Sequence, residues 1–101
     1  MSSSPKVTLQ DATLRVSGAM TMDHANALEI QGAVLLRQAK LPAARVDLSA
    51  TEELDSSALA VLFSWQRLQA STSGELSVVF APEALHTLVR LYGVGDALHW
   101  G

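Results

Sequence analysis

The chain has 101 residues, of which 49% are hydrophobic and 17% charged, so it can bury one core and is too apolar to stay disordered. Its formal net charge of -3 offers no basic excess for nucleic acid or an anionic membrane, and its lack of cysteine excludes disulfides and thiolate chemistry. No apolar run in the sequence approaches the roughly 18 residues that a membrane-spanning helix needs. We expect one cytoplasmic domain over residues 1–101, with a disordered tail over the Ser-rich residues 1–5.

Two short segments near the start alternate apolar and polar side chains, which is the pattern of half-buried strands. They cover residues 7–10 and 13–17, with Asp11 and Ala12 between them. Strands this close together predict an antiparallel hairpin. Gly18 is expected to end the second strand.

The period then changes to that of a helix, which we predict over residues 23–40. Thr21 or Asp23 is expected to cap its start, and Pro42 lies just beyond its end. Its apolar face comprises Leu28, Gly32, Leu35, Leu36 and Ala39. A short strand over residues 45–48 follows, and the mostly polar residues 49–57 are interpreted as a loop.

The rest of the chain continues the alternation of helix and strand. A helix is predicted over residues 58–70, and the apolar run 76–80 predicts a strand that is covered on both faces. Pro82 suits the first position of a third helix, which Gly93 and Gly95 end. The apolar face of this helix comprises Leu85, Leu88, Val89 and Tyr92. Residues 98–100 are the candidate for a last short strand. The order predicts an α/β fold, a mixed sheet in which an N-terminal antiparallel hairpin precedes parallel strands and helices pack on the sheet.

The sequence holds no pattern typical of an enzyme or a metalloprotein. The three histidines lack ligand spacing, no Gly-rich phosphate-binding loop occurs, and the acidic cluster before the second helix offers too few ligands for a metal. These residues are His24, His86 and His99, and Glu52, Glu53 and Asp55. We therefore expect a non-enzymatic protein, without cofactor or metal, that docks onto a partner protein.

The segment 55–58, Asp-Ser-Ser-Ala, carries the most information about function. By composition alone it is an ordinary helix start, where an Asp or Ser side chain accepts a hydrogen bond from a free N–H. The helix behind it has a core stripe and also apolar residues off that stripe, which favours a surface for a partner. The stripe comprises Ala58, Val61, Leu62, Trp65 and Leu68, and the residues off it are Leu59, Ala60 and Phe63.

Residues 46–49, Val-Asp-Leu-Ser, and residues 54–60, Leu-Asp-Ser-Ser-Ala-Leu-Ala, resemble the STAS domain family, which includes anti-sigma factor antagonists and small transporter subunits. The resemblance extends from about residue 7 to residue 100 and includes the order of elements. Within the family, three segments are most similar to the STAS subunit of the Mla complex, an ABC transporter complex that moves phospholipids between the two membranes of Gram-negative bacteria. These are residues 14–18, 55–60 and 89–98.

The resemblance implies a cytoplasmic subunit that binds the transporter's ATPase, lies at the inner-membrane face through it, and supports phospholipid transport and outer-membrane lipid asymmetry. In that subunit, the hydroxyl residue after the motif Asp contacts the ATPase, and by resemblance this position is Ser56 here. The docking surface that we expect comprises Asp55, Ser56, Leu59, Ala60, Phe63 and Arg67.

An anti-sigma factor antagonist is the alternative, and Ser57 then falls where a kinase partner adds a phosphate. Ala58 stands where antagonists usually have glycine, and Ser57 where transporter subunits often have a small residue, so both interpretations stay open. A third class, a small-ligand sensor, has no pocket signature in the sequence.

Overall fold

The computed structural model describes residues 4–101, which form a four-stranded sheet with three α-helices. In chain order the elements are β1 (Lys6–Gln10), β2 (Thr13–Met20), α1 (Met22–Ala39), β3 (Ala43–Leu54), α2 (Ser57–Ala70), β4 (Glu75–Val79), α3 (Glu83–Tyr92) and the 3-10 turn η1 (Gly95–Ala97). The sheet order is β1-β2-β3-β4, with β1 antiparallel to β2 and the other neighbours parallel. The predicted mixed sheet is confirmed. Residues 1–3 of the predicted tail lie outside the described residues.

A two-residue turn joins β1 to β2. Asp11 and Ala12 have φ angles of 49° and 62°, the left-handed pair whose twist matches a tight hairpin. Gly18 does not end β2, contrary to expectation. Its φ of 87° accompanies a register shift against β3, after which the strand continues to Met20. β2 therefore runs up to the start of α1.

β3 is longer than predicted because it includes residues 49–54 of the polar stretch for which the sequence predicts a loop. Residues 50–54 pair with the end of β2, from Ser17 opposite Ala50 to Met20 opposite Leu54. The pairing joins backbone groups, so the strand continues although its side chains are polar and residues 52 and 53 are exposed. The expectation of a loop up to Leu54 is wrong.

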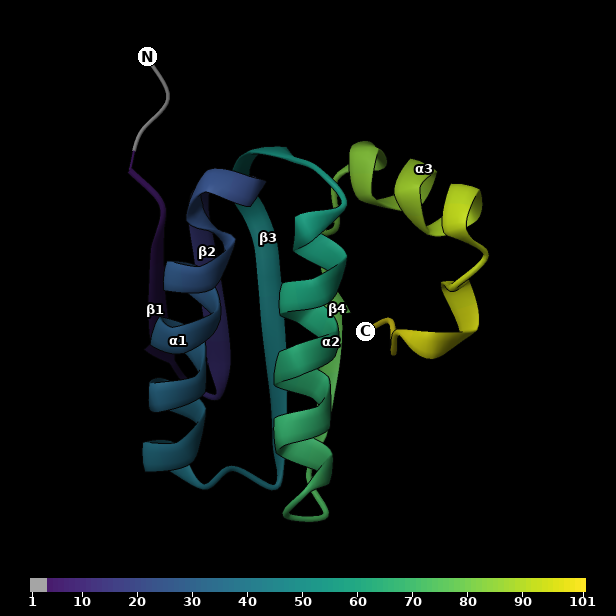
Figure 1. Cartoon of the computed structure of the whole chain (residues 1–101). Coiled ribbons are helices and arrows are strands. Elements are labelled where there is room, and N and C mark those ends of the chain that lie inside the picture. Colours follow the sequence, from purple (N-terminus) through teal and green to yellow (C-terminus); the bar gives the residue numbers. More distant parts are fainter. Residues whose placement is uncertain (1–3) are drawn as a thin grey trace.

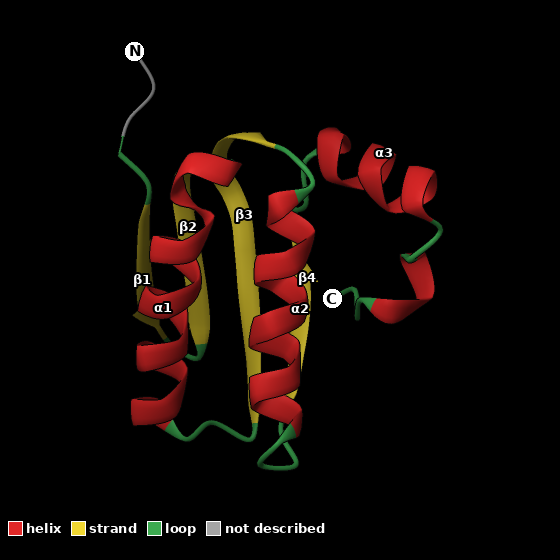
Figure 2. Ribbon diagram, viewed as in Figure 1, coloured by secondary structure: helices red, strands yellow, loops and turns green. Residues whose placement is uncertain are grey.

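The helices cover the sheet unevenly. α1 and α2 lie side by side on one face (Figures 1 and 2). The sheet side chains buried beneath them include Leu14, Val46 and Val78. Polar side chains such as Arg15 and Asp47, which are cross-strand neighbours, point to the other face. β4 is therefore not covered on both faces as predicted, because only alternate residues are fully buried. Phe80, predicted to lie in this strand, follows it and is exposed.

α3 lies to the side of α2, apart from α1 (Figure 1). Pro82 stands at its N-cap position, and Gly93 ends it in the left-handed conformation with a φ of 65°. Val89 is one of the side chains that anchor α3 in the core. Beyond η1, the predicted last strand is reduced to a single bridge between Trp100 and Val78.

A glycine in the middle of α1 lets the two long helices approach closely. A Cβ atom at Gly32 would overlap the indole ring of Trp65 in α2. The Trp65 Nε1–H donates to the carbonyl oxygen of Glu29 at 3.0 Å, and the Ser64 hydroxyl donates to the Glu29 carboxylate at 2.6 Å. The apolar pattern placed Gly32 on the core face correctly. Only the contact with Trp65 shows that no side chain fits at position 32.

We expect Gly32→Ala to lower the free energy of unfolding by about 1–3 kcal/mol, because the added methyl group overpacks the helix contact. Without the overlap, the same change in a helix would raise stability by about 0.5–1 kcal/mol. Urea unfolding of the wild type and Gly32→Ala measures the effect. In the Trp65→Phe background the loss should be smaller, since the phenyl ring leaves more room. A Gly32→Ala variant that is more stable than the wild type would contradict the close contact between Gly32 and the Trp65 ring.

Candidate functional site

One carboxylate lies where the sheet meets the starts of both long helices. Asp55 follows β3, and its Oδ2 accepts a hydrogen bond from the Met22 N–H at 3.0 Å while its Oδ1 accepts one from the Ser57 N–H at 2.8 Å. Its own N–H donates to the Met20 carbonyl oxygen at 3.3 Å. A single side chain therefore caps α1 and α2 together.

The serine and threonine at the two N-cap positions do not cap the helices. Thr21 stands at the N-cap position of α1, but its side chain makes no capping hydrogen bond, and Asp23 lies in the first turn. Asp55, far along the chain, supplies the acceptor for α1 instead. Ser56 stands at the N-cap position of α2 and also makes no side-chain capping bond. Because Asp55 bonds the Ser57 N–H, the exposed Ser56 hydroxyl is left without a role in the helix start.

The surroundings of Asp55 favour its ionised form. Partial desolvation raises the pKa of the Asp55 carboxyl, but hydrogen bonds from the Met22 and Ser57 N–H groups and the Ser57 hydroxyl lower it by more. The pKa therefore lies below its ordinary value. The N-terminal ends of α1 and α2 carry partial positive charge, which stabilises the carboxylate further.

The outward face of α2 carries a row of residues that begins at Ser56. Ser56, Ala60, Phe63 and Arg67 follow one another at intervals of four, three and four residues, so they share one side of the helix. All are exposed except Phe63, which is partly buried. These four residues are called the α2 ridge below. The structure thus brings the predicted contact residues onto one surface, with Asp55 at its base.

Leu59 is the exception among the predicted contact residues. It is only 6% exposed and belongs to the hydrophobic core, so the expectation that it lies off the core stripe is wrong. It contributes to a hollow of about 320 Å³ between α2 and α3, which Ser56, Phe63, Tyr92 and Val94 also line. The end of α3 and the segment after it stand on this side of α2, which explains why Leu59 is covered. Only the part of its side chain that lines the hollow can meet a partner.

Two residues of this hollow were not predicted as part of the site. Tyr92 was assigned to the apolar face of α3 but is 55% exposed, and Val94 follows the helix. Their nearness to Ser56 depends on where α3 packs against α2, which no local pattern in the sequence encodes.

The remaining candidate residues for chemistry do not assemble into a site. Among residues 4–101, no three His, Asp or Glu side chains are arranged to hold a metal ion. His86 stacks on Trp100 with ring centroids 5.0 Å apart, which ties α3 to the end of the chain. No helix within the described part of the chain has the length and apolar character needed to cross a membrane.

Comparisons with known proteins agree with this geometry. A family model described as "Mlab, STAS domain" matches residues 4–99. An anti-sigma factor antagonist from Mycobacterium paratuberculosis has a solved structure that is 28% identical, with a TM-score of 0.74 over 93% of this chain and 80% of that one. A Thermotoga maritima protein is 14% identical, with a TM-score of 0.75 over 95% and 84% of the two chains. The Bacillus cell fate determinant SpoIIAA in its phosphorylated form is 10% identical, with a TM-score of 0.67 over 96% and 90%. The last two likenesses show the fold alone. A sequence search of curated proteins finds no match.

We expect Asp55→Asn to lower the free energy of unfolding by about 2 kcal/mol at neutral pH, because an amide cannot accept hydrogen bonds from both helix starts. Since folding lowers the Asp55 pKa, its contribution is complete above the ordinary value of 3.8 and is lost as the pH falls through the folded-state pKa. Chemical denaturation between pH 7 and pH 2 should therefore show the wild type and the variant converging at low pH.

Asp23→Asn is the matched control for this experiment. Asp23 lies in the first turn of α1, so its replacement also removes a negative charge from that helix start, but its side chain does not cap the helix. We expect this control to cost less than half as much as Asp55→Asn. Equal losses would mean that charge alone, rather than the double cap, stabilises the helix starts.

Proposed function

Because this chain belongs to the STAS domain family, we propose that it is a non-enzymatic subunit of an Mla-type ABC transporter complex. In this role it binds the cytoplasmic ATPase and supports phospholipid transport and outer-membrane lipid asymmetry. The description of the matching family model, which includes the word Mlab, supports this choice within the family. The proposed location is the cytoplasm, at the inner-membrane face through the ATPase.

The observation that carries the proposal is the unused hydroxyl of Ser56 at the end of the α2 ridge. Asp55 caps α2, so the Ser56 hydroxyl is exposed and able both to donate and to accept a hydrogen bond. Ala60 and Phe63 offer apolar contact beside it, and aromatic side chains such as that of Phe63 are enriched at interfaces. Arg67, exposed at the far end, supplies a cation for a carboxylate of the ATPase.

We expect Ala60→Glu to weaken binding to the Mla-type ATPase of the same organism at least tenfold, because it places a charge at the centre of the ridge. Ala60 is exposed, so the fold should be unaffected. Ala27 on α1 is exposed as well, and Ala27→Glu is the matched control that should bind like the wild type. Ser56→Ala should weaken binding about 2- to 10-fold, the equivalent of one hydrogen bond of about 0.5–1.5 kcal/mol net.

The dissociation constants are measured by biolayer interferometry with the purified ATPase. Binding that is unchanged in both Ala60→Glu and Ser56→Ala would remove the α2 ridge from the interface. Failure of the wild-type protein to bind the ATPase at all would contradict the transporter function itself.

A second function has one observation in its favour, since the solved structure with 28% identity is an anti-sigma factor antagonist. In this alternative, an anti-sigma factor kinase binds the protein and phosphorylates Ser57. A phosphate there adds about two negative charges at the first residue of α2, beside the Asp55 carboxylate that bonds the Ser57 N–H at 2.8 Å. It would change the surface that a partner meets next to Ser56.

The two functions predict different effects of substitutions at Ser57. For a transporter subunit, Ser57→Ala should leave ATPase binding nearly unchanged. For an antagonist, Ser57→Ala should stay bound to the kinase, and Ser57→Asp should be released because it imitates part of the phosphate charge. The intact mass of the protein from its own host provides an independent measurement. A stoichiometric phosphate on Ser57, together with binding to a kinase and none to an ATPase, would overturn the transporter proposal.

A further inference from the structure

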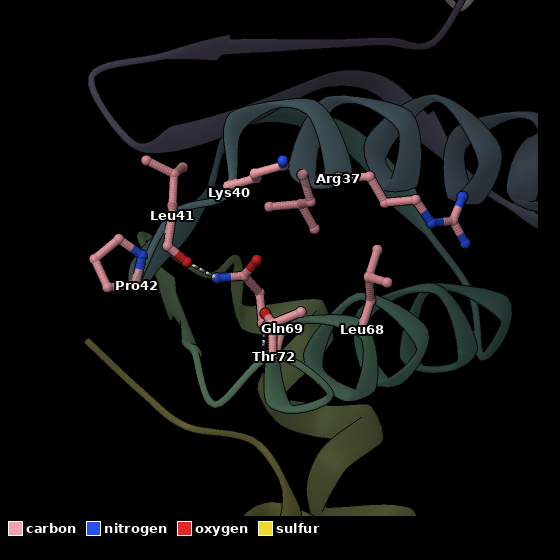
Figure 3. A pocket seen from close by; sticks show the side chains of 8 residues that line it. Arg37, Lys40, Leu41, Pro42, Leu68, Gln69 and Thr72 are labelled. Atoms are coloured by element: carbon pink, nitrogen blue, oxygen red, sulfur yellow. Dashed lines mark hydrogen bonds between the residues drawn. The ribbon is translucent and has the colours of Figure 1, made fainter.

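A second hollow lies at the opposite end of α1 and α2 from Ser56. It has a volume of about 450 Å³ and lies between the last turns of the two helices (Figure 3). Leu68 faces it from α2. Leu36 and Leu41 line it from α1 and from the connection to β3. Its volume is within the range of small-molecule pockets, roughly 300–1,000 Å³.

The walls of this hollow are fixed by hydrogen bonds. The Gln69 side chain is 3% exposed, and its Nε2 donates to the carbonyl oxygens of Leu41 and Glu75, each at 3.1 Å. The Gly74 N–H donates to the Gln69 carbonyl oxygen at 2.8 Å. These bonds join the end of α2 to the α1–β3 connection and to the start of β4. The hollow is therefore built into the fold, as preformed ligand sites are.

The charges around the hollow are all positive. Arg37 and Lys40 line it from the last turn and the C-cap of α1, and no acidic side chain lines it. Neither cation forms an ion pair with a carboxylate of residues 4–101. The C-terminal ends of α1 and α2 each add about half a negative charge, so the sum is close to one positive charge. This sum matches a ligand with a single negative charge.

We infer that this hollow binds a single-chain carboxylate. Its alkyl chain lies against Leu36, Leu41 and Leu68, and its carboxylate meets Arg37 and Lys40, whose charges no acidic residue neutralises. A hollow of about 450 Å³ has the size of a pocket for one small molecule, which favours a small molecule over a protein segment. The site is remote from Ser56 and does not depend on the proposed function.

Decanoate, below its micelle concentration, is the probe. We expect it to shift the amide resonances of Leu41, Leu68 and Thr72 in heteronuclear NMR spectra, and to bind at least tenfold more tightly than decanol or acetate in calorimetric titrations. Arg37→Gln/Lys40→Gln should weaken decanoate binding at least tenfold. Lys6→Gln/Arg90→Gln removes the same net charge from β1 and α3 and should leave the affinity unchanged. All four replaced residues are exposed, so the fold should tolerate both variants.

Several results would overturn the inference. Equal affinity for decanoate and decanol, or an affinity that is insensitive to Arg37→Gln/Lys40→Gln, would show that the cations do not recognise the head group. Decyl phosphate binding more tightly than decanoate would exclude the preference for a single negative charge. An acidic peptide that occupies these residues while decanoate does not would assign the hollow to a protein partner.

Discussion

The double cap by Asp55 is the interaction on which the rest of the structure depends. Two parallel helices begin at the same edge of the sheet, and their free N–H groups and partial positive charges converge there. One ionised carboxylate meets both, through Met22 in α1 and Ser57 in α2. Because Asp55 makes this contact, Ser56 is not needed as a cap and its hydroxyl remains at the surface. A structural requirement of the fold thereby leaves a polar group available for recognition.

The contact between α1 and α2 acts together with this cap. Asp55 holds the two helices at their starts, while Gly32, Trp65 and Glu29 hold them further along through close packing and hydrogen bonds. A helix fixed at both places presents its outward face in one orientation. The α2 ridge is therefore ordered before any partner arrives, which lowers the entropic cost of binding.

The two surfaces proposed for binding lie at opposite ends of the same helix pair and differ in their electrostatics. At the N-terminal ends, the partial positive charge of the helices faces acidic side chains, namely the Asp55 carboxylate and Asp23 in the first turn of α1. At the C-terminal ends, Arg37 and Lys40 exceed the partial negative charge of the helices. A protein with a net charge of -3 thus has a locally positive hollow, separate from the ridge.

The sequence by itself determined the order of the elements, the approximate bounds of all three α-helices and the hairpin, because apolar periodicity and turn residues are local signals. It also indicated the family through residues 54–60. Only the tertiary structure decided that β3 continues to Leu54, that Leu59 is buried and that Asp55 caps α1. Strand pairing, the docking of α3 and a hydrogen bond across 33 residues join distant segments, and such long-range contacts leave no trace in local composition.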